Sequence, residues 1–267
     1  MKPYACTIIV VLAVITIGCT ASKKTAANQH HFLAAPNPTA MPSESSEDDE
    51  FDLLDEDLEK QLEEQKVKVS DPLKPVNRMM YHINDKLYFW VLKPCARAYK
   101  KALPKPARIS IRNFFHNLTT PVRFVSCHLQ GKHKAAGTEL HRFAYNTTAG
   151  VLGFGDPAKD KLGLEPADED LGQTLGKWGL GNGVYIVLPL FGPSTVRDTV
   201  GLVGGQFLNP VRYVESTEVS IAISAGQITN ENSLRLGEYK AFKDAALDPY
   251  IAMRQAYIQY RKKRVQE

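Results

Sequence analysis

Cysteines and long apolar runs are scarce in this sequence. Four cysteines in 267 residues are too few for a disulfide-stabilised scaffold, and Cys95 and Cys127 either pair or remain free thiols. The longest apolar run after residue 19 is 184–191, and a proline interrupts it. Because a helix needs about 20 apolar residues to cross a bilayer, we predict no membrane-spanning helix in residues 20–267.

The motifs of common enzymes are also missing. The sequence contains no CxxC, HExxH, GxxxxGK(S/T) or GxSxG, which are the signatures of zinc sites, nucleotide-binding loops and hydrolase nucleophiles. Ser194, His141 and Asp198 could form a catalytic triad, but any chain of this length offers such a set. We therefore predict a protein that is not an enzyme and that uses no metal or cofactor.

The first 19 residues are typical of an export signal. Lys2 gives a positive start, residues 7–17 are largely apolar, and a glycine and Cys19 follow. A cysteine directly after a small residue resembles a bacterial lipoprotein signal, so we predict a signal peptide at 1–18 and lipidation of Cys19. Thr16 departs from the usual pattern, and ordinary cleavage that leaves Cys19 as a free thiol is the alternative.

Charge divides the rest of the chain. Residues 43–66 carry 12 acidic residues and 2 lysines, and with the polar residues before them they predict a lipidated, largely disordered acidic tether at 19–70. This tether is either a solvated charge run or a docking segment for a basic partner or domain. Residues 67–267 carry 28 Lys and Arg against 17 Asp and Glu. This excess indicates either anionic lipid head groups as partners or charge for solubility, and we expect no nucleic acid.

Helix signals dominate residues 71–267. Apolar side chains recur every three or four positions in several short stretches, and prolines open or break these stretches. We therefore predict a mainly α fold. The expected helices cover 76–90 (ended by Lys93-Pro94), a second stretch to 102, 107–117, 121–131, 134–151, 168–178, 196–207, 216–236 (one helix or a broken pair) and 249–260.

One segment departs from the helical pattern. Glycine-rich residues 179–183 precede the apolar, β-branched run 184–191, which predicts a short strand or an irregular apolar loop. Many short helices that carry aromatic residues beside Lys and Arg suit a protein lying in a bilayer interface. An ordinary soluble helical domain gives similar patterns, so composition alone leaves both open.

Five ordered blocks of sequence resemble the MlaA (VacJ) family of lipoproteins. Each block is weak alone, but together they follow the family's order from residue 71 to about residue 261. The blocks are Asp71–Tyr81 (DPLKPVNRMMY); Pro104–Arg108 with Asn113, Phe114, Asn117, Leu118 and Pro121; Arg142, Phe143, Asn146, Thr147, Gly150, Gly153 and Phe154; Asp170–Asp198 with its Gly, Trp and Pro positions; and Asp248–Tyr250 with Arg254.

The resemblance implies a fold and a function. Members of the family form a ring of short amphipathic helices embedded in the inner leaflet of the outer membrane, with a polar channel. As lipid-anchored proteins of its periplasmic face, they remove mislocalised phospholipids from the outer leaflet and pass them to a periplasmic lipid carrier, which maintains lipid asymmetry. The implied partners are glycerophospholipids, a porin trimer and that carrier. The alternatives are a porin-docking scaffold that moves no lipid, or a lipid hydrolase that uses Ser194.

Two groups of residues are candidates for function within this interpretation. The glycine loop, the apolar run and part of the first helix are candidates for gating the channel, and a structural turn with a core strand is the alternative. Three arginines are candidates for guiding phosphates, or else form salt bridges. The gating candidates are Gly179, Gly181, Gly183, Tyr185, Pro189, Phe191, Tyr81, Asn84 and Asp85, and the phosphate candidates are Arg123, Arg142 and Arg197.

Overall fold

Helices make up most of the chain that the structure describes. The structure is a computed structural model that describes residues 71–267, so the predicted signal peptide, Cys19 and the tether lie outside the described residues. The predicted mainly α fold with a short strand segment is confirmed. The elements are α3 (Lys74–Leu87), η1 (Tyr88–Leu92), α4 (Lys93–Ala102), α5 (Lys105–Leu118), α6 (Thr120–Leu129), α7 (His133–Thr148), α8 (Pro157–Leu162), α9 (Leu171–Lys177), β1 (Tyr185–Leu188), β2 (Gly192–Thr195), α10 (Val196–Gln206), η2 (Pro210–Tyr213), α11 (Thr217–Leu234), α12 (Glu238–Ala245) and α13 (Pro249–Gln266).

Most helices begin at a proline or at a capping side chain. Proline occupies one of the first two positions of α3, α4, α5, α6, α8 and α13, where its missing N–H has no partner to lose. Side-chain oxygens of Asp156, Asp170, Thr195, Ser216 and Asp248 accept hydrogen bonds from N–H groups in the first turns of α8, α9, α10, α11 and α13. These residues explain why most helix starts were predictable from the sequence, although α8 and α12 lie outside the predicted helices.

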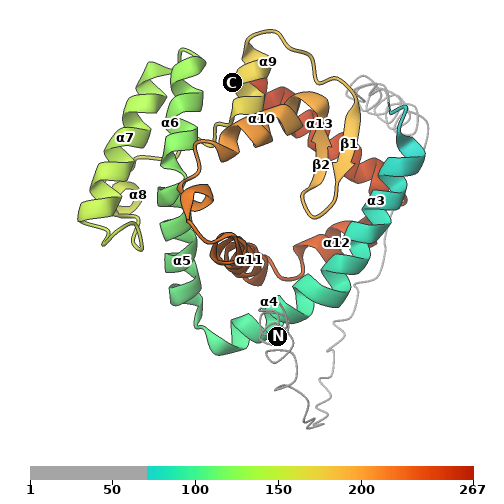
Figure 1. Cartoon of the computed structure of the whole chain (residues 1–267), viewed down its shortest axis with the longest axis horizontal. Coiled ribbons are helices and arrows are strands. Elements are labelled where there is room, and N and C mark those ends of the chain that lie inside the picture. Colours follow the sequence, from blue (N-terminus) through green and yellow to red (C-terminus); the bar gives the residue numbers. More distant parts are fainter. Residues whose placement is uncertain (1–70) are drawn as a thin grey trace, which may run out of the picture. The chain divides into compact units, whose positions relative to one another are not determined.

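The helix break predicted at Lys93 and Pro94 is wrong, because the chain stays helical there. Tyr88–Leu92 form a π-helical turn, and the N–H of Lys93 donates to the carbonyl of Tyr88. Pro94 has no N–H to donate, and the wider turn shifts the hydrogen-bond ladder just before the missing donor. Helix α3 therefore continues through η1 into α4 along one side of the molecule (Figure 1).

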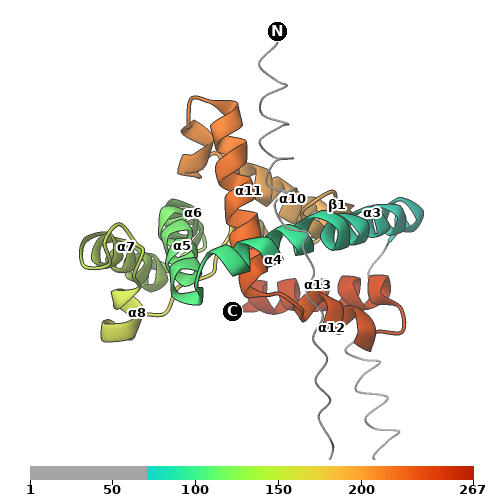
Figure 2. The same cartoon turned by 90° about the horizontal axis from the view of Figure 1, so that it is seen from below.

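The helices of residues 71–267 form a ring around a central opening (Figure 1), as predicted. α3, η1 and α4 make one side, α5 and α6 the next, and α9, α10 and the β1–β2 hairpin complete it. α7 packs outside against α6. Seen from the side, α11 stands across the ring and packs against α4 and α5, while α12 and α13 lie on one face (Figure 2).

The strand predicted within 184–191 is confirmed as one arm of a hairpin. β1 pairs antiparallel with β2, with Tyr185 opposite Thr195 and Leu188 opposite Gly192. The tip, residues 189–191, reaches the edge of the opening (Figure 1), and Leu190 adopts a φ of +68°. A two-stranded hairpin is marginally stable by itself, so its position depends on the elements that it touches.

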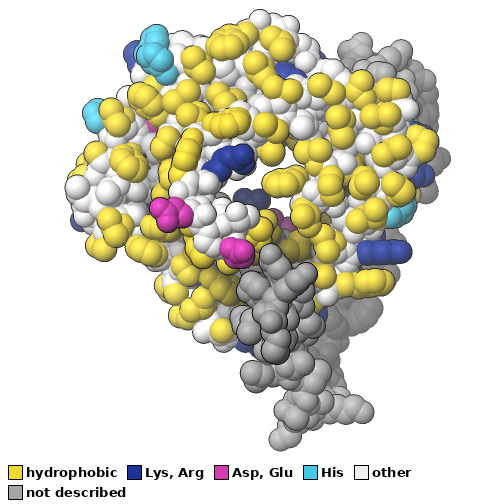
Figure 3. Space-filling model, in the orientation of Figure 1, with side chains coloured by type: hydrophobic (Ala, Val, Ile, Leu, Met, Phe, Trp, Pro, Cys, Tyr) yellow, Lys and Arg dark blue, Asp and Glu magenta, His cyan; other side chains and the backbone are white. Residues whose placement is uncertain are grey.

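In residues 71–267, polar side chains are buried more often than hydrophobic ones, which is the opposite of most globular domains. Ten hydrophobic residues are buried against nineteen polar or charged ones, and thirty large hydrophobic side chains are exposed. Soluble monomers rarely expose apolar area on this scale. Figure 3 shows hydrophobic side chains spread over one face around the opening. None of the described helices is both long and apolar enough to cross a membrane.

Candidate functional site

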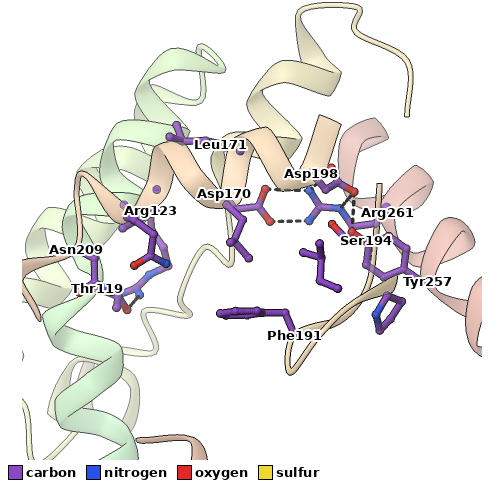
Figure 4. A pocket seen from close by; sticks show the side chains of 17 residues that line it. Thr119, Arg123, Asp170, Leu171, Phe191, Ser194, Asp198, Asn209, Tyr257 and Arg261 are labelled. Atoms are coloured by element: carbon purple, nitrogen blue, oxygen red, sulfur yellow. Dashed lines mark hydrogen bonds and ion pairs between the residues drawn. The ribbon is translucent and has the colours of Figure 1, made fainter. Parts of the chain in front are cut away.

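A cavity of about 420 Å³ lies among the elements that surround the central opening. The hairpin and α10 supply most of its apolar wall, while α9, α13 and the α5–α6 junction supply its polar wall (Figure 4). The cavity therefore offers both kinds of surface to one occupant. Its lining residues are Thr119, Val122, Arg123, Asp170, Leu171, Leu188, Phe191, Pro193, Ser194, Asp198, Gly201, Leu202, Gly205, Gln206, Asn209, Tyr257 and Arg261.

Arg261 is the centre of an ion-pair network in the polar wall. Its guanidinium donates to both carboxylate oxygens of Asp170, at 2.5 and 2.9 Å, and to both of Asp198, at 2.8 and 3.0 Å. Tyr257 donates its hydroxyl to Asp198 at 2.7 Å, and Arg197 Nε donates to the same carboxylate at 2.9 Å. The network joins α9, α10 and α13 across the wall (Figure 4).

Both carboxylates of this network are held in the ionised form. Burial raises the pKa of Asp198 and of Asp170, but the hydrogen bonds and charge of Arg261 outweigh it, so the pKa of each lies below its usual range. Burial likewise lowers the pKa of Arg261, and the two carboxylates raise it more. Two carboxylates then face Arg261 and Arg197, which makes the wall polar but electrically balanced.

Two glycines set the close packing of α9 on α10 behind this wall. A Cβ atom at Gly201 would lie 2.2 Å from the backbone nitrogen of Gly172, and one at Gly172 would lie 2.8 Å from a carboxylate oxygen of Asp198. Neither position has room for a side chain. The two helix backbones therefore touch, which brings Asp170 and Asp198 within reach of one arginine.

Two asparagines of α3 hold the hairpin at the cavity edge. Asn77 donates to the carbonyl of Tyr185 and accepts from the N–H of Val187, both at 2.9 Å. Asn84 donates to the carbonyl of Leu188 at 2.8 Å and accepts from the N–H of Leu190 at 2.9 Å. Each side-chain amide thus pairs with the backbone as a neighbouring strand would.

The gating candidates fall into separate places. Of the nine, only Phe191 lines the central cavity, where it projects from the hairpin tip (Figure 4). Tyr81 and Tyr185 are buried in the small apolar core with Val187, Tyr250 and Ile258. These two positions fit the alternative of a structural strand and turn.

The glycine loop and the neighbouring candidates lie outside the cavity lining. Gly179 and Gly183 have φ values of +92° and +67°, which glycine adopts at low cost. Gly181 and Pro189 do not line the cavity either. Asp85 binds Lys243 of α12 at 2.8 Å and accepts from the hydroxyl of Tyr239 at 3.0 Å. Asp85 therefore ties α3 to α12.

The three phosphate candidates already have internal partners. Arg123 pairs with Glu139 at 2.7 Å, Arg142 with Asp156 at 2.9 Å, and Arg197 with Asp198 at 2.8 Å. All three arginines are buried. Arg123 lines the central cavity, Arg142 lines a second cavity, and Arg197 lines neither. This geometry fits the salt-bridge alternative, and a role in guiding phosphates stays a prediction.

Sequence reasoning did not select the main polar residues of the cavity, which are Asp170, Tyr257 and Arg261. Arg261 directly follows the last predicted helix, 249–260, and lies on the observed helix α13. Its partners Asp198 and Asp170 are 63 and 91 residues away along the chain. No local pattern connects residues so far apart.

The catalytic set considered from the sequence does not assemble in the described residues. Ser194 and Asp198 both line the cavity, but His141 does not, and His141 is exposed on α7. The Ser194 hydroxyl lies 3.0 Å from that of Thr199.

Cys95 and Cys127 are free thiols, and burial, with the nearby Glu169, raises the pKa of Cys127 to about 11.

Fold and cavity together define a class of protein: a helical ring that exposes many apolar side chains and holds a cavity with one apolar and one charged wall. The chain belongs to the MlaA lipoprotein family, whose sequence model matches residues 69–264. A solved structure described as "Structural basis for maintenance of bacterial outer membrane lipid asymmetry" matches with a TM-score of 0.65 and 30% identity, over 73% of this chain and 99% of the other.

Curated relatives cover the same part of the chain. The Escherichia coli "Intermembrane phospholipid transport system lipoprotein MlaA" is 35% identical over 198 residues, which are 71% of this chain and 76% of the relative. A Haemophilus influenzae protein of the same name is 30% identical over 71% and 77% of the two chains. An uncharacterised Rickettsia conorii protein is 30% identical over 75% and 80%.

Proposed function

We propose that this protein is an outer-membrane lipoprotein that removes mislocalised phospholipids from the outer leaflet and passes them to a periplasmic carrier. The observation that carries the proposal is a cavity with one apolar and one charged wall inside a ring that exposes thirty large apolar side chains. Relatives named for intermembrane phospholipid transport support the substrate class. Transport then maintains the lipid asymmetry of the membrane.

The two walls suit the two parts of a phospholipid. Acyl chains pack against Leu188, Phe191 and Leu202, while Arg261 and its carboxylates give the head group polar partners as it passes. A charged head group that crosses an apolar layer without polar partners loses its hydration at high cost. A wall that already holds balanced charges offers hydrogen bonds in place of water. Only the head group needs the polar path, and the chains stay in apolar surroundings.

We propose that the hairpin controls access to this path. Its tip carries Leu190 and Phe191, which are 67% and 62% exposed, so the tip can shift between cavity and lipid without exposing new apolar surface to water. The glycine loop (Gly179, Gly181 and Gly183) supplies the hinge on one side, together with Pro189, and Tyr81, Asn84, Asp85 and Tyr185 fix the base. Arg123, Arg142 and Arg197 contribute positive potential around the path.

We propose that the ring lies in the inner leaflet of the outer membrane, anchored by lipid at Cys19. Trp90, Phe207 and Ile221 are 75%, 60% and 63% exposed, and such side chains gain by entering the acyl region. In the proposed organisation, residues 1–18 are a signal peptide, 19–70 a tether, and 71–267 the ring. A porin trimer and a periplasmic lipid carrier are its proposed partners.

Deletion of the gene tests the proposal. We expect more phospholipid in the outer leaflet and greater detergent sensitivity, both restored by the wild-type gene. Unchanged values in both assays contradict transport. A scaffold without transport predicts instead that cavity substitutions have no effect on the barrier while porin binding persists. A lipid hydrolase predicts release of fatty acid in vitro that disappears in Ser194→Ala.

The anchor has a separate test. Cys19→Ser is expected to abolish incorporation of radiolabelled palmitate, because the thiol is the proposed acylation site. Cys95→Ser serves as the matched control and is expected to keep the label. Label that persists in Cys19→Ser contradicts the assignment of the lipidation site.

A further inference from the structure

A second cavity of about 440 Å³ lies between α5, α7, the 156–168 segment and α11. Most of its lining residues are polar or charged, and Thr119 lines both cavities. The two cavities are therefore neighbours that share one wall residue. Such a pair can take a molecule whose apolar part lies in one cavity and whose charged part lies in the other.

The charges of this second cavity are not fully paired. Arg112, Arg142, Lys159 and Arg235 line it, against Asp156, Asp168 and Glu231. Three of these four cations have carboxylate partners: Arg142 with Asp156, Lys159 with Glu165, and Arg235 with Glu231. Arg112 is exposed and makes no ion pair with any residue in 71–267. One guanidinium at the cavity is thus without a counter-charge from the described chain.

Arg235 is the second cation available to a ligand. Within residues 71–267 its one ion pair is with Glu231, one turn earlier at the end of α11, at 3.0 Å, and the two side chains are 66% and 38% exposed. Exposed pairs of this kind contribute little stability. The guanidinium can therefore turn toward a stronger acceptor at little cost.

The helices that carry these two arginines are fixed to one another by buried hydrogen bonds. Arg108, one turn before Arg112, donates to the carbonyl and hydroxyl oxygens of Ser233 at 2.7 and 3.1 Å. Asn230 donates in return to the carbonyl of Arg108 at 3.0 Å, and its own Oδ1 is buried without a partner in the described chain. The two guanidiniums therefore extend from a preorganised pair of helices, and the wall keeps an unused acceptor.

We propose that this second cavity binds the phosphodiester of a phospholipid head group, with Arg112 as the main contact and Arg235 as the second. The inference rests on the proposed transport of phospholipids and names the subsite that holds the head group. The planar guanidinium fork matches two phosphate oxygens. The three lining carboxylates oppose a second negative charge, so a diester binds better than a phosphomonoester.

Binding of short-chain lipids to the full-length, lipidated protein in detergent tests the site. The probes are dihexanoyl phosphatidylethanolamine, dihexanoyl phosphatidic acid and inorganic phosphate, measured by calorimetry. We expect Arg112→Gln to weaken binding of the phosphatidylethanolamine about tenfold or more, and Arg112→Lys to restore part of it. Arg97→Gln is the matched control, since Arg97 is exposed on α4 outside the cavity, and it should leave binding within about twofold.

Each other outcome overturns the subsite. Equal effects of Arg112→Gln and Arg97→Gln show that Arg112 is not a contact. Phosphatidic acid that binds as tightly as phosphatidylethanolamine contradicts the preference for a diester. Inorganic phosphate that binds as tightly, with the same dependence on Arg112, makes this a site for free phosphate. If any of these outcomes is observed while the wild-type gene still returns outer-leaflet phospholipid in the deletion strain to its normal low level, the proposed subsite is wrong and the proposed transport function stands.

Discussion

Asn77 and Asn84 of α3 each form two hydrogen bonds with the hairpin backbone, one donated and one accepted. The backbone groups that Asn84 binds lie three residues after those that Asn77 binds. Seven residues of helix rise about 10.5 Å, and three residues of strand span about 10 Å. The two spacings agree, so one helix face can pair with consecutive parts of the chain from Tyr185 to Leu190. The asparagine side chains of α3 thereby supply the backbone hydrogen bonds that a neighbouring strand would supply.

Loss of the Asn84 amide is expected to free the hairpin tip while leaving its base in place. In Asn84→Ala, the N–H of Leu190 loses its acceptor, so we predict faster hydrogen exchange at residues 188–191 and a stability loss of about 1–2 kcal/mol. Asn232→Ala is the control, because among the described residues Asn232 bonds within its own helix, to the carbonyl of Ile228. Unchanged exchange at the tip in Asn84→Ala contradicts the clamp.

Asp198 is expected to be the most costly single residue to neutralise in the cavity wall. Its side chain is 5% exposed and faces Arg197 and Arg261, which are 5% and 7% exposed. Asp198→Asn leaves buried positive charge uncompensated, at a cost of about 3–5 kcal/mol in the free energy of unfolding. Denaturant unfolding in mild detergent measures this. Glu267→Gln, which breaks an exposed pair with Arg264, should change it by less than about 0.5 kcal/mol.

The same pair predicts a pH dependence. The folded-state pKa of Asp198 is lower than its unfolded value, so its contribution is complete above the unfolded pKa of about 4. It is lost as the pH falls further, through the lower folded-state pKa. The stability difference between wild type and Asp198→Asn should therefore be constant near neutral pH and shrink below about pH 4. A difference that grows as the pH falls contradicts the ion pair.

The contact between α9 and α10 is expected to tolerate no side chain at Gly201. An added Cβ would lie 2.2 Å from the backbone of Gly172, so Gly201→Ala should cost about 1–3 kcal/mol. Gly226→Ala is the matched control, since nothing lies within 4 Å of a Cβ there, and it should stabilise α11 by up to about 1 kcal/mol. Equal effects at the two positions in thermal unfolding would show that the helices do not pack through these glycines.

Tryptophan fluorescence is expected to report entry into lipid. The sequence has two tryptophans, Trp90 and Trp178, which are 75% and 56% exposed. Addition of phospholipid vesicles should shift their emission to shorter wavelength as the rings leave water. Trp178→Phe leaves the emission of Trp90 alone, and Trp90→Phe leaves that of Trp178. Cys19→Ser removes the proposed lipid anchor, so any shift that remains comes from the helices. No shift in Cys19→Ser protein that binds the vesicles would place both rings outside the membrane.

The sequence predicted the elements better than their connections. Prolines and capping residues mark most helix starts, so most of the helices and the strand after the glycine loop could be located, while the short helices α8 and α12 were missed. The second arm of the hairpin, Gly192–Thr195, was missed because its Gly-Pro-Ser-Thr sequence has little strand propensity. The ring itself came from the family resemblance, because amphipathic faces do not say which helices are neighbours.

The functional site was harder to predict for a physical reason. Arg261, Asp170 and Asp198 meet because two glycines let α9 and α10 touch, and no spacing along the chain encodes that meeting. The predicted phosphate arginines illustrate the same limit. In the sequence, Arg123, which is buried with its partner Glu139, and Arg112, which has no ion pair within residues 71–267, both appear as a basic residue on a helix with apolar neighbours.

Filling the cavity tests the central claim most directly. Gly205 lines it, and a Cβ there has ordinary contact with Val122 at 3.6 Å, whereas Gly226 faces open space. Gly205→Phe and Gly226→Phe are expressed at equal levels in the deletion strain, and outer-leaflet phospholipid is measured by chemical labelling of intact cells. We predict that Gly205→Phe leaves the lipid as high as in the deletion strain, while Gly226→Phe restores the wild-type level. Full restoration by Gly205→Phe would contradict passage of phospholipid through this cavity.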